Sequence, residues 1–227
     1  MSKNNIIEIN NLERSFTEGE RIQYVLRDLN MEVEKGECVI LQGVSGSGKT
    51  TLLNLIAGID RPNKGKISVE GKSISKLSDR YLSSFRGQSI GMVFQHYHLI
   101  PHLSVAQNIS VPLTVTNMTL SAQQKRVESV MDLVNISHKA TSSAATLSGG
   151  EKQRASIARA LASDPNILLR DEPTANLDRD NTETIIALFK TLHDMGKTLL
   201  IATHDPRFES LPFASRIVRM QQGEIVS

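Results

Sequence analysis

Apolar and polar residues alternate in two stretches of the first third of the chain. Every second residue is apolar in 29–33, and residues 67–69 repeat this alternation over a shorter length. A period of two is typical of half-buried strands, because successive side chains of a strand point to opposite faces. Glycines between charged residues in 18–20 and 35–37 predict turns. We therefore expect β-structure in this part of the chain.

Three short runs are apolar throughout and end in residues with useful chemistry. The runs 38–41, 167–169 and 199–202 are followed by Gly43, by Asp171-Glu172 and by Thr203-His204. Continuous apolar runs of this length predict strands of a parallel sheet that is covered on both faces. Ligands of such sheets bind at the carboxyl ends of the strands, so we expect a binding site where these residues meet.

Helical periodicity fills the segments between these runs. Apolar positions three or four residues apart predict helices over 52–59, 121–134 and 185–192, the first and last ending near Gly58 and Gly196. Residues 216–226 predict a small hairpin.

The domain organisation follows from these patterns. The β signal fades between residues 104 and 162, so we expect 87–162 to form a mostly helical insertion. The chain is predicted to be a single α/β domain over 1–227, with approximately 1–86 and 163–227 as its core.

Composition narrows the classes of function. Of the 227 residues 39% are hydrophobic, and 26 basic residues nearly balance 24 acidic ones, which argues against a protein that coats nucleic acid. The single cysteine, Cys38, excludes an intrachain disulfide and favours a reducing compartment. No apolar run approaches the ~20 residues needed to span a bilayer, and the start resembles no signal peptide. We expect a soluble, cytoplasmic chain without a nucleic-acid partner.

A glycine-rich segment after the first apolar run matches the phosphate-binding pattern G-x-x-x-x-G-K-[ST]. Its residues are Gly43, Val44, Ser45, Gly46, Ser47, Gly48, Lys49 and Thr50. Glycines let the backbone curl so that its N–H groups face an anion, and the dipole of the following helix favours phosphate. Lys49 could reach the outer phosphates, and the hydroxyl of Thr50 could bind Mg²⁺.

Two later strand ends carry further candidates. Asp171 could hold Mg²⁺ through water, and Glu172 could act as a general base, although carboxylates at strand ends are common. His204 lies at another strand end, where a lone histidine is more often structural than catalytic.

The segment LSGGEKQ predicts a second helix start. Ser148 and Glu151 form a capping box before a helix that we expect to run to about Ala162, and two glycines at its entry leave N–H groups accessible. Such an N-terminus could hold phosphate, but most capping boxes only stabilise their own helix.

Taken in order, the phosphate loop, Gln95, LSGGEKQ, the strand with Asp171-Glu172, and His204 resemble the nucleotide-binding subunits of ABC transporters. The resemblance covers essentially the whole chain, and the LSGG motif is highly specific for this family. It implies a P-loop NTPase fold with a mostly parallel sheet core, an N-terminal antiparallel β subdomain, and a helical insertion that carries the signature.

The resemblance also implies roles for residues near the phosphates. Residues Gly43 to Thr51 match the Walker A loop, and Gln95 matches the Q-loop glutamine that lies near Mg²⁺ and the attacking water. Asp171 matches the Walker B aspartate and Glu172 matches the catalytic base. His204 matches the switch histidine. Magnesium would then be held by Thr50, Gln95 and Asp171.

Other residues match the family's contacts to nucleotide or to a second subunit. Ser148, Gly149 and Gly150 match the signature that contacts the γ-phosphate held by the other subunit, and 175–178, including Asp178, match the D-loop. Phe16 occupies the place of the aromatic residue that stacks on adenine. Tyr24 is a weaker candidate for that role, and Phe16 could instead be a core strand residue.

Two features depart from the family pattern or extend it. Arg170 stands before Asp171, where the family has a small or apolar residue, and a charge at the end of a buried strand needs a partner. We therefore predict an acidic or carbonyl partner for Arg170. Histidines at 96, 98 and 102 could converge on a metal ion, but we favour a segment that contacts a membrane partner.

The resemblance implies an ATPase that acts with Mg²⁺ in a dimer of two copies around two ATP molecules. An integral membrane permease on other chains would be the partner, placing this chain on the cytoplasmic face of the inner membrane. The segment 94–101 is most similar to the branch of lipoprotein release and macrolide efflux. The energising subunit of a solute importer and a soluble ABC ATPase without a transport role stay as alternatives.

Overall fold

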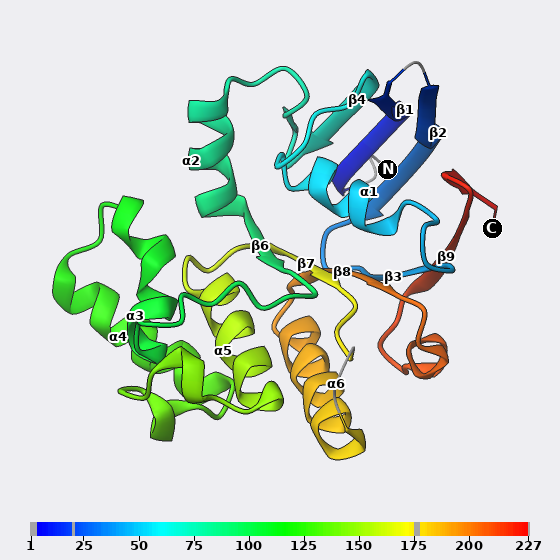
Figure 1. Cartoon of the computed structure of the whole chain (residues 1–227). Coiled ribbons are helices and arrows are strands. Elements are labelled where there is room, and N and C mark those ends of the chain that lie inside the picture. The colour runs from blue at the N-terminus through cyan, green and yellow to red at the C-terminus, as the bar shows by residue number, and fades with distance from the viewer. Residues whose placement is uncertain (1–3, 20, 175–177, 227) are drawn as a thin grey trace.

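The computed structural model describes residues 4–19, 21–174 and 178–226. Two sheets lie in the described part, with helices packed around them (Figure 1). A helical part lies to one side of the larger sheet, and the smaller sheet lies on the opposite side with α1 between it and the larger one.

The larger sheet has six strands in the order β10-β9-β3-β8-β7-β6. All neighbouring strands are parallel except β9 and β10. The three apolar runs therefore form adjacent parallel strands, as predicted, and the tail forms the predicted hairpin. The strands are β3 (Cys38–Gln42), β6 (Ile90–Val93), β7 (Ile167–Asp171), β8 (Thr198–Thr203), β9 (Arg216–Gln221) and β10 (Glu224–Ile225).

Side chains of this sheet alternate between two hydrophobic cores. Val39 and Leu41 of β3 face the core that contains α1 and the smaller sheet, whereas Cys38 and Ile40 face the core that contains α3 to α6. The same alternation holds along β7 and β8. Both faces are covered, which explains why these strands are apolar throughout.

The smaller sheet has four strands in the order β2-β1-β4-β5, all antiparallel. Leu29, Met31 and Val33 are buried and the residues between them are exposed, as their alternation predicted. The strands are β1 (Asn5–Glu18), β2 (Arg21–Glu34), β4 (Lys64–Val69) and β5 (Lys72–Ser73).

The three predicted helices are present as α1, α4 and α6, and α5 follows the predicted cap. The bounds of α4 differ from the expected ones by one residue, whereas α1 begins at 49 instead of 52 and α6 at 179 instead of 185. Gly58 and Gly196 have positive φ angles just after α1 and α6, where a left-handed residue ends a helix. The α-helices are α1 (Lys49–Ile56), α2 (Asp79–Ser89), α3 (Val105–Ser110), α4 (Leu120–Leu133), α5 (Gly149–Leu161) and α6 (Arg179–Asp194). Short 3₁₀ helices are η1 (Val111–Val115), η2 (Ser137–Lys139), η3 (Ala144–Thr146) and η4 (Pro206–Ser210).

The expected start of the helical insertion at residue 87 is wrong, because the larger sheet resumes there. Ile90–Val93 forms β6, an edge strand paired with β7, and the helical part begins only after it. The strand is four residues long and contains Gly91, which lies so close to the carbonyl of Ala160 that a Cβ would be 2.6 Å from that oxygen. A glycine required by close packing hid the β pattern.

Among the helices formed by residues 4–19, 21–174 and 178–226, none combines the length and the hydropathy that a membrane span requires.

Candidate functional site

The glycine-rich loop joins the end of β3 to the start of α1, as its sequence predicted. Gly46 and Gly48 have φ angles of 80° and 104°, which only glycine adopts freely. A Cβ on Gly43 would lie 2.4 Å from the carbonyl oxygen of Met220, and one on Gly48 would lie 2.9 Å from that of Val25. The loop thus needs glycine both for its turns and for its fit against neighbouring strands.

Loop residues differ in exposure. Val44, Ser45 and Gly46 are exposed at the tip, whereas Ser47, Gly48 and Lys49 are buried. Thr50 is exposed and Thr51 half-buried at the start of α1. The hydroxyl of Ser47 is buried without a hydrogen-bond partner.

The ammonium group of Lys49 lies inside this loop. It donates to the carbonyl oxygens of Gly43 at 2.6 Å and Val44 at 3.2 Å, and it lies 3.9 Å from Oε1 of Glu172. The side chain is only 6% exposed. A buried cation held by two carbonyls and one carboxylate is placed to meet an anion that enters the loop.

Asp171 ends β7 directly beside the start of α1. The hydroxyl of Thr50 donates to its Oδ2 at 2.8 Å, while Oδ1 is buried without a partner. Burial raises the pKa of Asp171, the hydrogen bond from Thr50 opposes that rise, and the charge of Glu172 adds to it. A buried carboxylate with a free oxygen is suited to a cation.

Glu172 has an unusual backbone. Its φ angle is 46°, in the left-handed region that few residues other than glycine adopt. Its N–H donates to the carbonyl of Ala202 at 2.8 Å and so extends the β7–β8 pairing. Its carboxylate accepts a hydrogen bond from Thr203 at 3.3 Å and lies 2.9 Å from Nδ1 of His204. His204 is largely exposed, so the carboxylate bridges the buried strand end and the surface.

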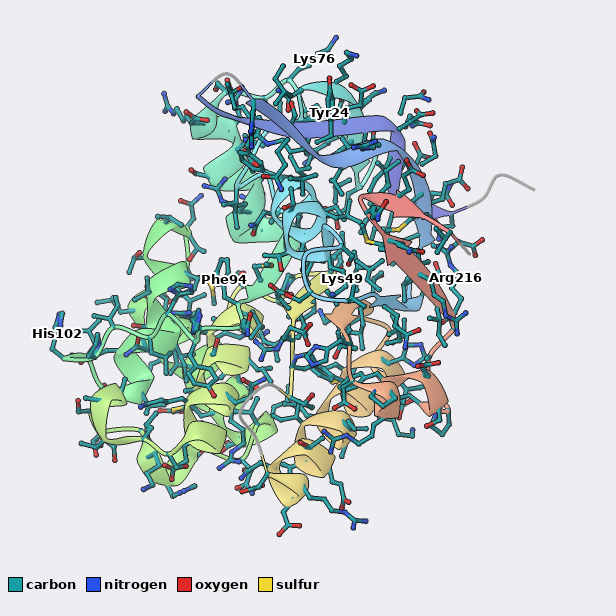
Figure 2. All side chains as sticks on the ribbon, turned by 45° about the vertical axis from the view of Figure 1, so that its right-hand side comes forward. Tyr24, Lys49, Lys76, Phe94, His102 and Arg216 are labelled. Atoms are coloured by element: carbon teal, nitrogen blue, oxygen red, sulfur yellow. The ribbon has the colours of Figure 1, made fainter. Side chains whose placement is uncertain are left out.

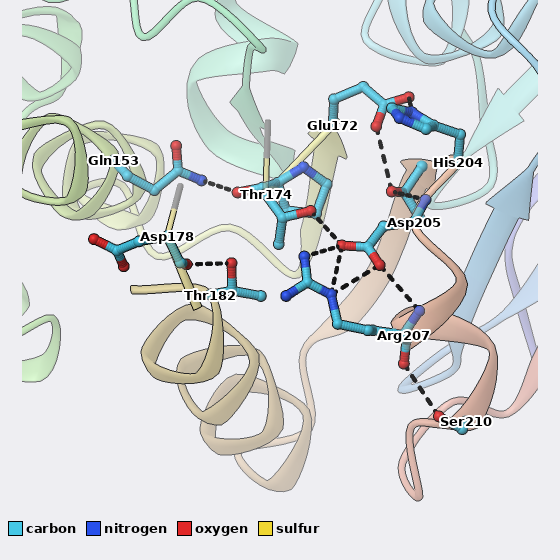
Figure 3. A network of polar contacts seen from close by, with 11 residues as sticks. Gln153, Glu172, Thr174, Asp178, Thr182, His204, Asp205, Arg207 and Ser210 are labelled. Atoms are coloured by element: carbon cyan, nitrogen blue, oxygen red, sulfur yellow. Dashed lines mark hydrogen bonds and ion pairs between the residues drawn. The ribbon is translucent and has the colours of Figure 1, made fainter. Parts of the chain in front are cut away.

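A polar network extends from this carboxylate along the loop after β8 (Figure 3). The hydroxyl of Thr203 also accepts the N–H of Asp205 at 3.0 Å, and Asp205 in turn accepts from Thr174 at 2.8 Å. Hydrogen bonds from Arg207 lower the pKa of Asp205 to about 2, so this carboxylate stays charged. The network fixes the segment that carries His204 to the segment that follows Glu172.

The predicted partner of Arg170 is confirmed. Its guanidinium donates to the carbonyl oxygens of Phe94 at 2.6 Å and Glu172 at 3.3 Å, and to Oε1 of Gln153 at 2.9 Å. The side chain is 1% exposed, and burial lowers its pKa to about 10.

Ser148 begins α5 with the predicted capping box. Its hydroxyl accepts the N–H of Glu151 at 3.3 Å, and Glu151 accepts the N–H of Ser148 at 2.8 Å. Gly149 is exposed, but Gly150 is buried, and a Cβ on it would lie 2.1 Å from Oδ1 of Asn181. Gly150 is therefore covered where α5 and α6 approach each other, whereas Gly149 is open to solvent.

Asp178 begins α6 as its N-cap. Its carboxylate accepts the N–H of Asn181 at 2.8 Å and also bonds the amide side chain of that residue. The remainder of the predicted D-loop, 175–177, lies outside the described residues.

The two aromatic candidates for adenine lie on neighbouring strands, Phe16 on β1 and Tyr24 on β2. Phe16 is 45% exposed, with the guanidinium of Arg14 over its ring at 4.3 Å, so it is no core residue. Tyr24 is 48% exposed, with Arg27 at 5.6 Å. Both rings could stack on a flat ligand, and the geometry leaves both open.

Gln95 follows Phe94 directly after β6 and is exposed. The rings of His96 and His98 are 6.5 Å apart, and His102 lies at the outer end of the helical part, away from Lys49 (Figure 2). Within the described residues no group of three or more side chains of the kinds that bind metals comes together.

Contacts thus join Lys49, Thr50, Asp171, Glu172 and His204 into one site. No contact in the described part joins this site to Phe16, Gln95, Ser148 or Asp178 directly. Sequence reasoning missed Gln153, Thr174, Thr203 and Asp205 as partners of site residues, although Thr203 and Asp205 flank His204 and Gln153 closes the LSGGEKQ motif.

Comparisons with known proteins point to one family. Residues 26–175 match the family model described as ABC transporter. An ABC transporter ATP-binding protein of Thermotoga maritima, itself uncharacterized, is 40% identical over 97% of this chain and 93% of its own length. The ABC transporter ATP-binding protein YvrO of Bacillus subtilis, also uncharacterized, is 38% identical over 97% of this chain and 96% of its own length.

Longer relatives and solved structures are also similar. The macrolide export ATP-binding/permease protein MacB of Aggregatibacter actinomycetemcomitans is 38% identical over 98% of this chain, which spans 34% of that protein. The cassette MJ0796, solved as a dimer in a post-hydrolysis state bound to ADP and Pi, is 35% identical with a TM-score of 0.90, and the match covers 97% of both chains.

Proposed function

This chain belongs to the ABC transporter family, and from that premise we propose that it binds and hydrolyses ATP as the energising subunit of a transporter. The observation that carries the proposal is the convergence of Lys49, Thr50, Asp171 and Glu172 around one glycine-rich loop. These residues combine an anion site with two carboxylates of different surroundings, which phosphoryl transfer to water requires.

The loop would hold the phosphates of ATP. Backbone N–H groups from Gly43 to Thr51 and the positive end of α1 attract negative charge. The ammonium of Lys49 would exchange its carbonyl partners for the outer phosphates, a stronger charge-assisted contact. We propose Phe16 as the residue that stacks on adenine, since it occupies the place of the adenine-stacking aromatic residue in the family and its ring is exposed.

The donor set also fits Mg²⁺. The free Oδ1 of Asp171 and the hydroxyl of Thr50 are hard oxygen ligands side by side, and Gln95 would add a third from the segment after β6. When bound, the ion neutralises charge that develops on the transferred phosphoryl group. The raised pKa of Asp171 supports this assignment, because a nearby cation would offset the cost of its buried charge.

Glu172 would act as general base for hydrolysis. Its carboxylate takes a proton from water as the water oxygen attacks the γ-phosphorus, and the bond to the oxygen that bridges to the β-phosphate breaks. His204 contacts the same carboxylate oxygen that lies nearest Lys49, so it is placed to touch both the base and the γ-phosphate.

The signature residues would act on a second copy. Ser148 and Gly149 are exposed at the N-terminus of α5, which lies in the helical part and away from α1 (Figure 1). Among the described residues, the phosphate loop of the same chain makes no contact with Ser148 or Gly149. We propose that Ser148, Gly149 and Gly150, with Asp178 nearby on α6, complete the ATP site of a partner chain, as supported by the dimeric form of the similar cassette MJ0796.

We propose a membrane permease as the second partner. MacB, a relative of this chain, is named as ATP-binding protein and permease together, and this chain spans only about a third of it. The similarity to MacB favours a transporter that exports its cargo or transmits motion through the membrane subunit. The chain would then lie on the cytoplasmic face of the membrane. We further propose that the helices after β6, up to about residue 162, move as a subdomain. A solute importer and a soluble ABC ATPase are the alternatives.

The dimer and the base are tested together with Glu172→Gln. We expect turnover to fall by roughly 10²–10⁴-fold because proton transfer to the base is lost, while ATP, and not ADP, converts the purified chain to a dimer in analytical ultracentrifugation. The control Lys49→Ala should abolish both binding and dimerisation. Full turnover in Glu172→Gln would remove Glu172 as the base, and ATP-bound monomers at every concentration would contradict the shared site.

The membrane partner is tested by affinity purification of the tagged chain from solubilised membranes. A permease recovered in stoichiometric amounts supports the transporter role. Quantitative recovery of the chain in the cytosol, with no membrane protein bound, would favour the soluble ATPase instead.

A further inference from the structure

Arg170 is a fully buried cation beside the proposed base. It is the fourth of the five residues of the buried strand β7, and its backbone lies between Val93 of the edge strand β6 and Ile201 of β8. Its guanidinium reaches three separate segments, namely the carbonyls of Phe94 and Glu172 and the side chain of Gln153. One side chain thus connects Phe94, the residue before Gln95, with the signature helix α5 and with Glu172.

The contact with Glu172 bears on a strained residue. A left-handed backbone at a residue other than glycine costs on the order of 1 kcal/mol or more and persists only where the surroundings hold it. The N–H of Glu172 is held by Ala202, and its C=O is held by Arg170. These two hydrogen bonds restrain the backbone of Glu172 at its N–H and at its C=O, so the direction of its carboxylate depends on them.

Gln153 restrains the next residue of the backbone, Pro173. Oε1 of Gln153 accepts a hydrogen bond from Arg170. Its Nε2 donates to the carbonyl of Pro173 at 2.9 Å (Figure 3). The side chain is 1% exposed, so it has no water to replace these partners. Helix α5 therefore holds the backbone on both sides of the Glu172–Pro173 bond, once directly and once through Arg170.

The arrangement is costly for a residue that only packs. Nε of Arg170 is buried without a partner, and burying a guanidinium carries a large desolvation penalty. An aliphatic side chain would fill the same space without either cost. The presence of a buried guanidinium despite this desolvation cost is better explained by the residues that it positions.

We propose that Arg170 is a positioning residue that fixes the left-handed conformation of Glu172 and makes it depend on the contact between α5 and β7. This inference rests on the proposed role of Glu172 as base. A shift of α5 relative to the sheet changes the Gln153–Arg170 contact and thereby the direction of the base. Arg170 itself touches no substrate.

Three variants test the proposal in the full chain. Arg170→Met keeps the length of the side chain and removes its donors, and Arg170→Lys keeps the charge with fewer donors. Leu168→Ala is the matched control, because Leu168 is buried on the same strand and belongs to the core that contains α3 to α6. Each is measured for kcat, for binding of a fluorescent ATP analogue, for melting temperature, and for hydrogen exchange in the peptide that covers residues 167–174.

We expect kcat of Arg170→Met to fall by about tenfold to a hundredfold, since a small misplacement of a reacting group has effects of this size. Nucleotide affinity should change less than threefold, and exchange at Glu172 should accelerate. Arg170→Lys should recover part of kcat. Leu168→Ala should lower the melting temperature while kcat per folded molecule stays within threefold of the parent.

An unchanged kcat and unchanged exchange in a folded Arg170→Met chain would overturn the inference and leave the proposed function intact. Equal losses of kcat in Arg170→Met and Leu168→Ala would also overturn it, because general destabilisation would explain both. A parent chain that hydrolyses no ATP would defeat the proposed function, and hydrogen exchange at Glu172 would still decide whether Arg170 holds this residue.

Discussion

Two neighbouring carboxylates at the end of β7 have different surroundings. Asp171 is buried against Thr50 with a raised pKa, whereas Glu172 turns through a left-handed backbone toward the exposed His204. Adjacent residues of an extended strand would point to opposite faces. The positive φ angle places the second carboxylate on the side of the loop, so that the two carboxylates meet different partners, Thr50 for Asp171 and His204 with Lys49 for Glu172.

Glu151 shows the opposite pKa shift, which gives a prediction at the scale of one residue. The hydrogen bond from the backbone of Ser148 lowers the pKa of Glu151 to about 2 from an ordinary value of 4.5. A lowered pKa in the folded chain means that the ionised cap stabilises the fold above pH 4.5. This contribution is lost as the pH falls from 4.5 toward 2.

Glu151→Gln provides the matched comparison, because glutamine can also complete a capping box but does not titrate. We expect the difference in free energy of unfolding between the parent and Glu151→Gln to be constant from pH 7 to 5 and to shrink below pH 4.5, as measured by urea unfolding. A difference that does not depend on pH would show that the charge of Glu151 contributes nothing to the cap.

The sequence predicted some of these residue contacts and not others. A charge at the end of an apolar strand must have a partner, so a carbonyl partner of Arg170 could be expected. That Gln153 is a second partner could not be expected, because it lies 17 positions away in the sequence on α5. The hydrophobic pattern of the sequence does not show how α5 packs against β7. The left-handed backbone of Glu172 leaves no mark on its residue type, because glutamate is ordinarily not found there.

At the scale of elements, α5 and α6 meet through a glycine. Gly150 is buried where the side chain of Asn181 lies, and that side chain is held in turn by Asp178 and Arg154. The nearest atom to a Cβ at Gly150 would be Oδ1 of Asn181 at 2.1 Å. This contact links the signature helix to the helix that Asp178 begins.

Gly150→Ala should therefore destabilise the chain by about 1–3 kcal/mol through overpacking, despite the higher helix propensity of alanine. In the background of Asn181→Ala the same change should become neutral or stabilising by up to about 1 kcal/mol, since only the propensity remains. Urea unfolding of the four chains measures the coupling. An equal cost of Gly150→Ala in both backgrounds would show that Asn181 is not the cause.

Elements with a strong period were predictable, and elements fixed by tertiary packing were not. Helix α4 carries its apolar residues at helical spacing and was expected within one residue of its bounds. Strand β6 is short and contains Gly91, and α2 has polar residues at most positions, so neither gave a clear period. Both lie where the larger sheet meets the helical part, which explains why the predicted boundary at residue 87 was misplaced.

At the scale of the whole molecule, one sheet separates two cores and carries the site at its carboxyl edge. Residues of β3 contribute to both cores, and the phosphate loop follows directly from the end of this strand. Opening of β3 would therefore disrupt both cores and the loop together. Nucleotide that binds the loop should stabilise the whole sheet by mass action.

Cys38 makes this coupling measurable, because it is the only cysteine and is fully buried at the start of β3. Burial raises the pKa of its thiol to about 12, with a smaller contribution from Glu37, so the folded chain holds almost no reactive thiolate. Alkylation by iodoacetamide must then proceed through opening of the sheet. Its rate reports the population of the open form when closing is fast.

We expect ATP at 100 times its Kd to slow the alkylation of Cys38 by about a hundredfold, because binding stabilises the folded form by about 2.7 kcal/mol. The measurement uses Glu172→Gln so that ATP is consumed only slowly, and mass spectrometry follows the labelled fraction. The same chain with Lys49→Ala in addition should label at one rate with and without ATP. Labelling that ATP does not slow in the first chain would mean that β3 opens without disturbing the loop, and that the sheet and the nucleotide site are not one cooperative unit.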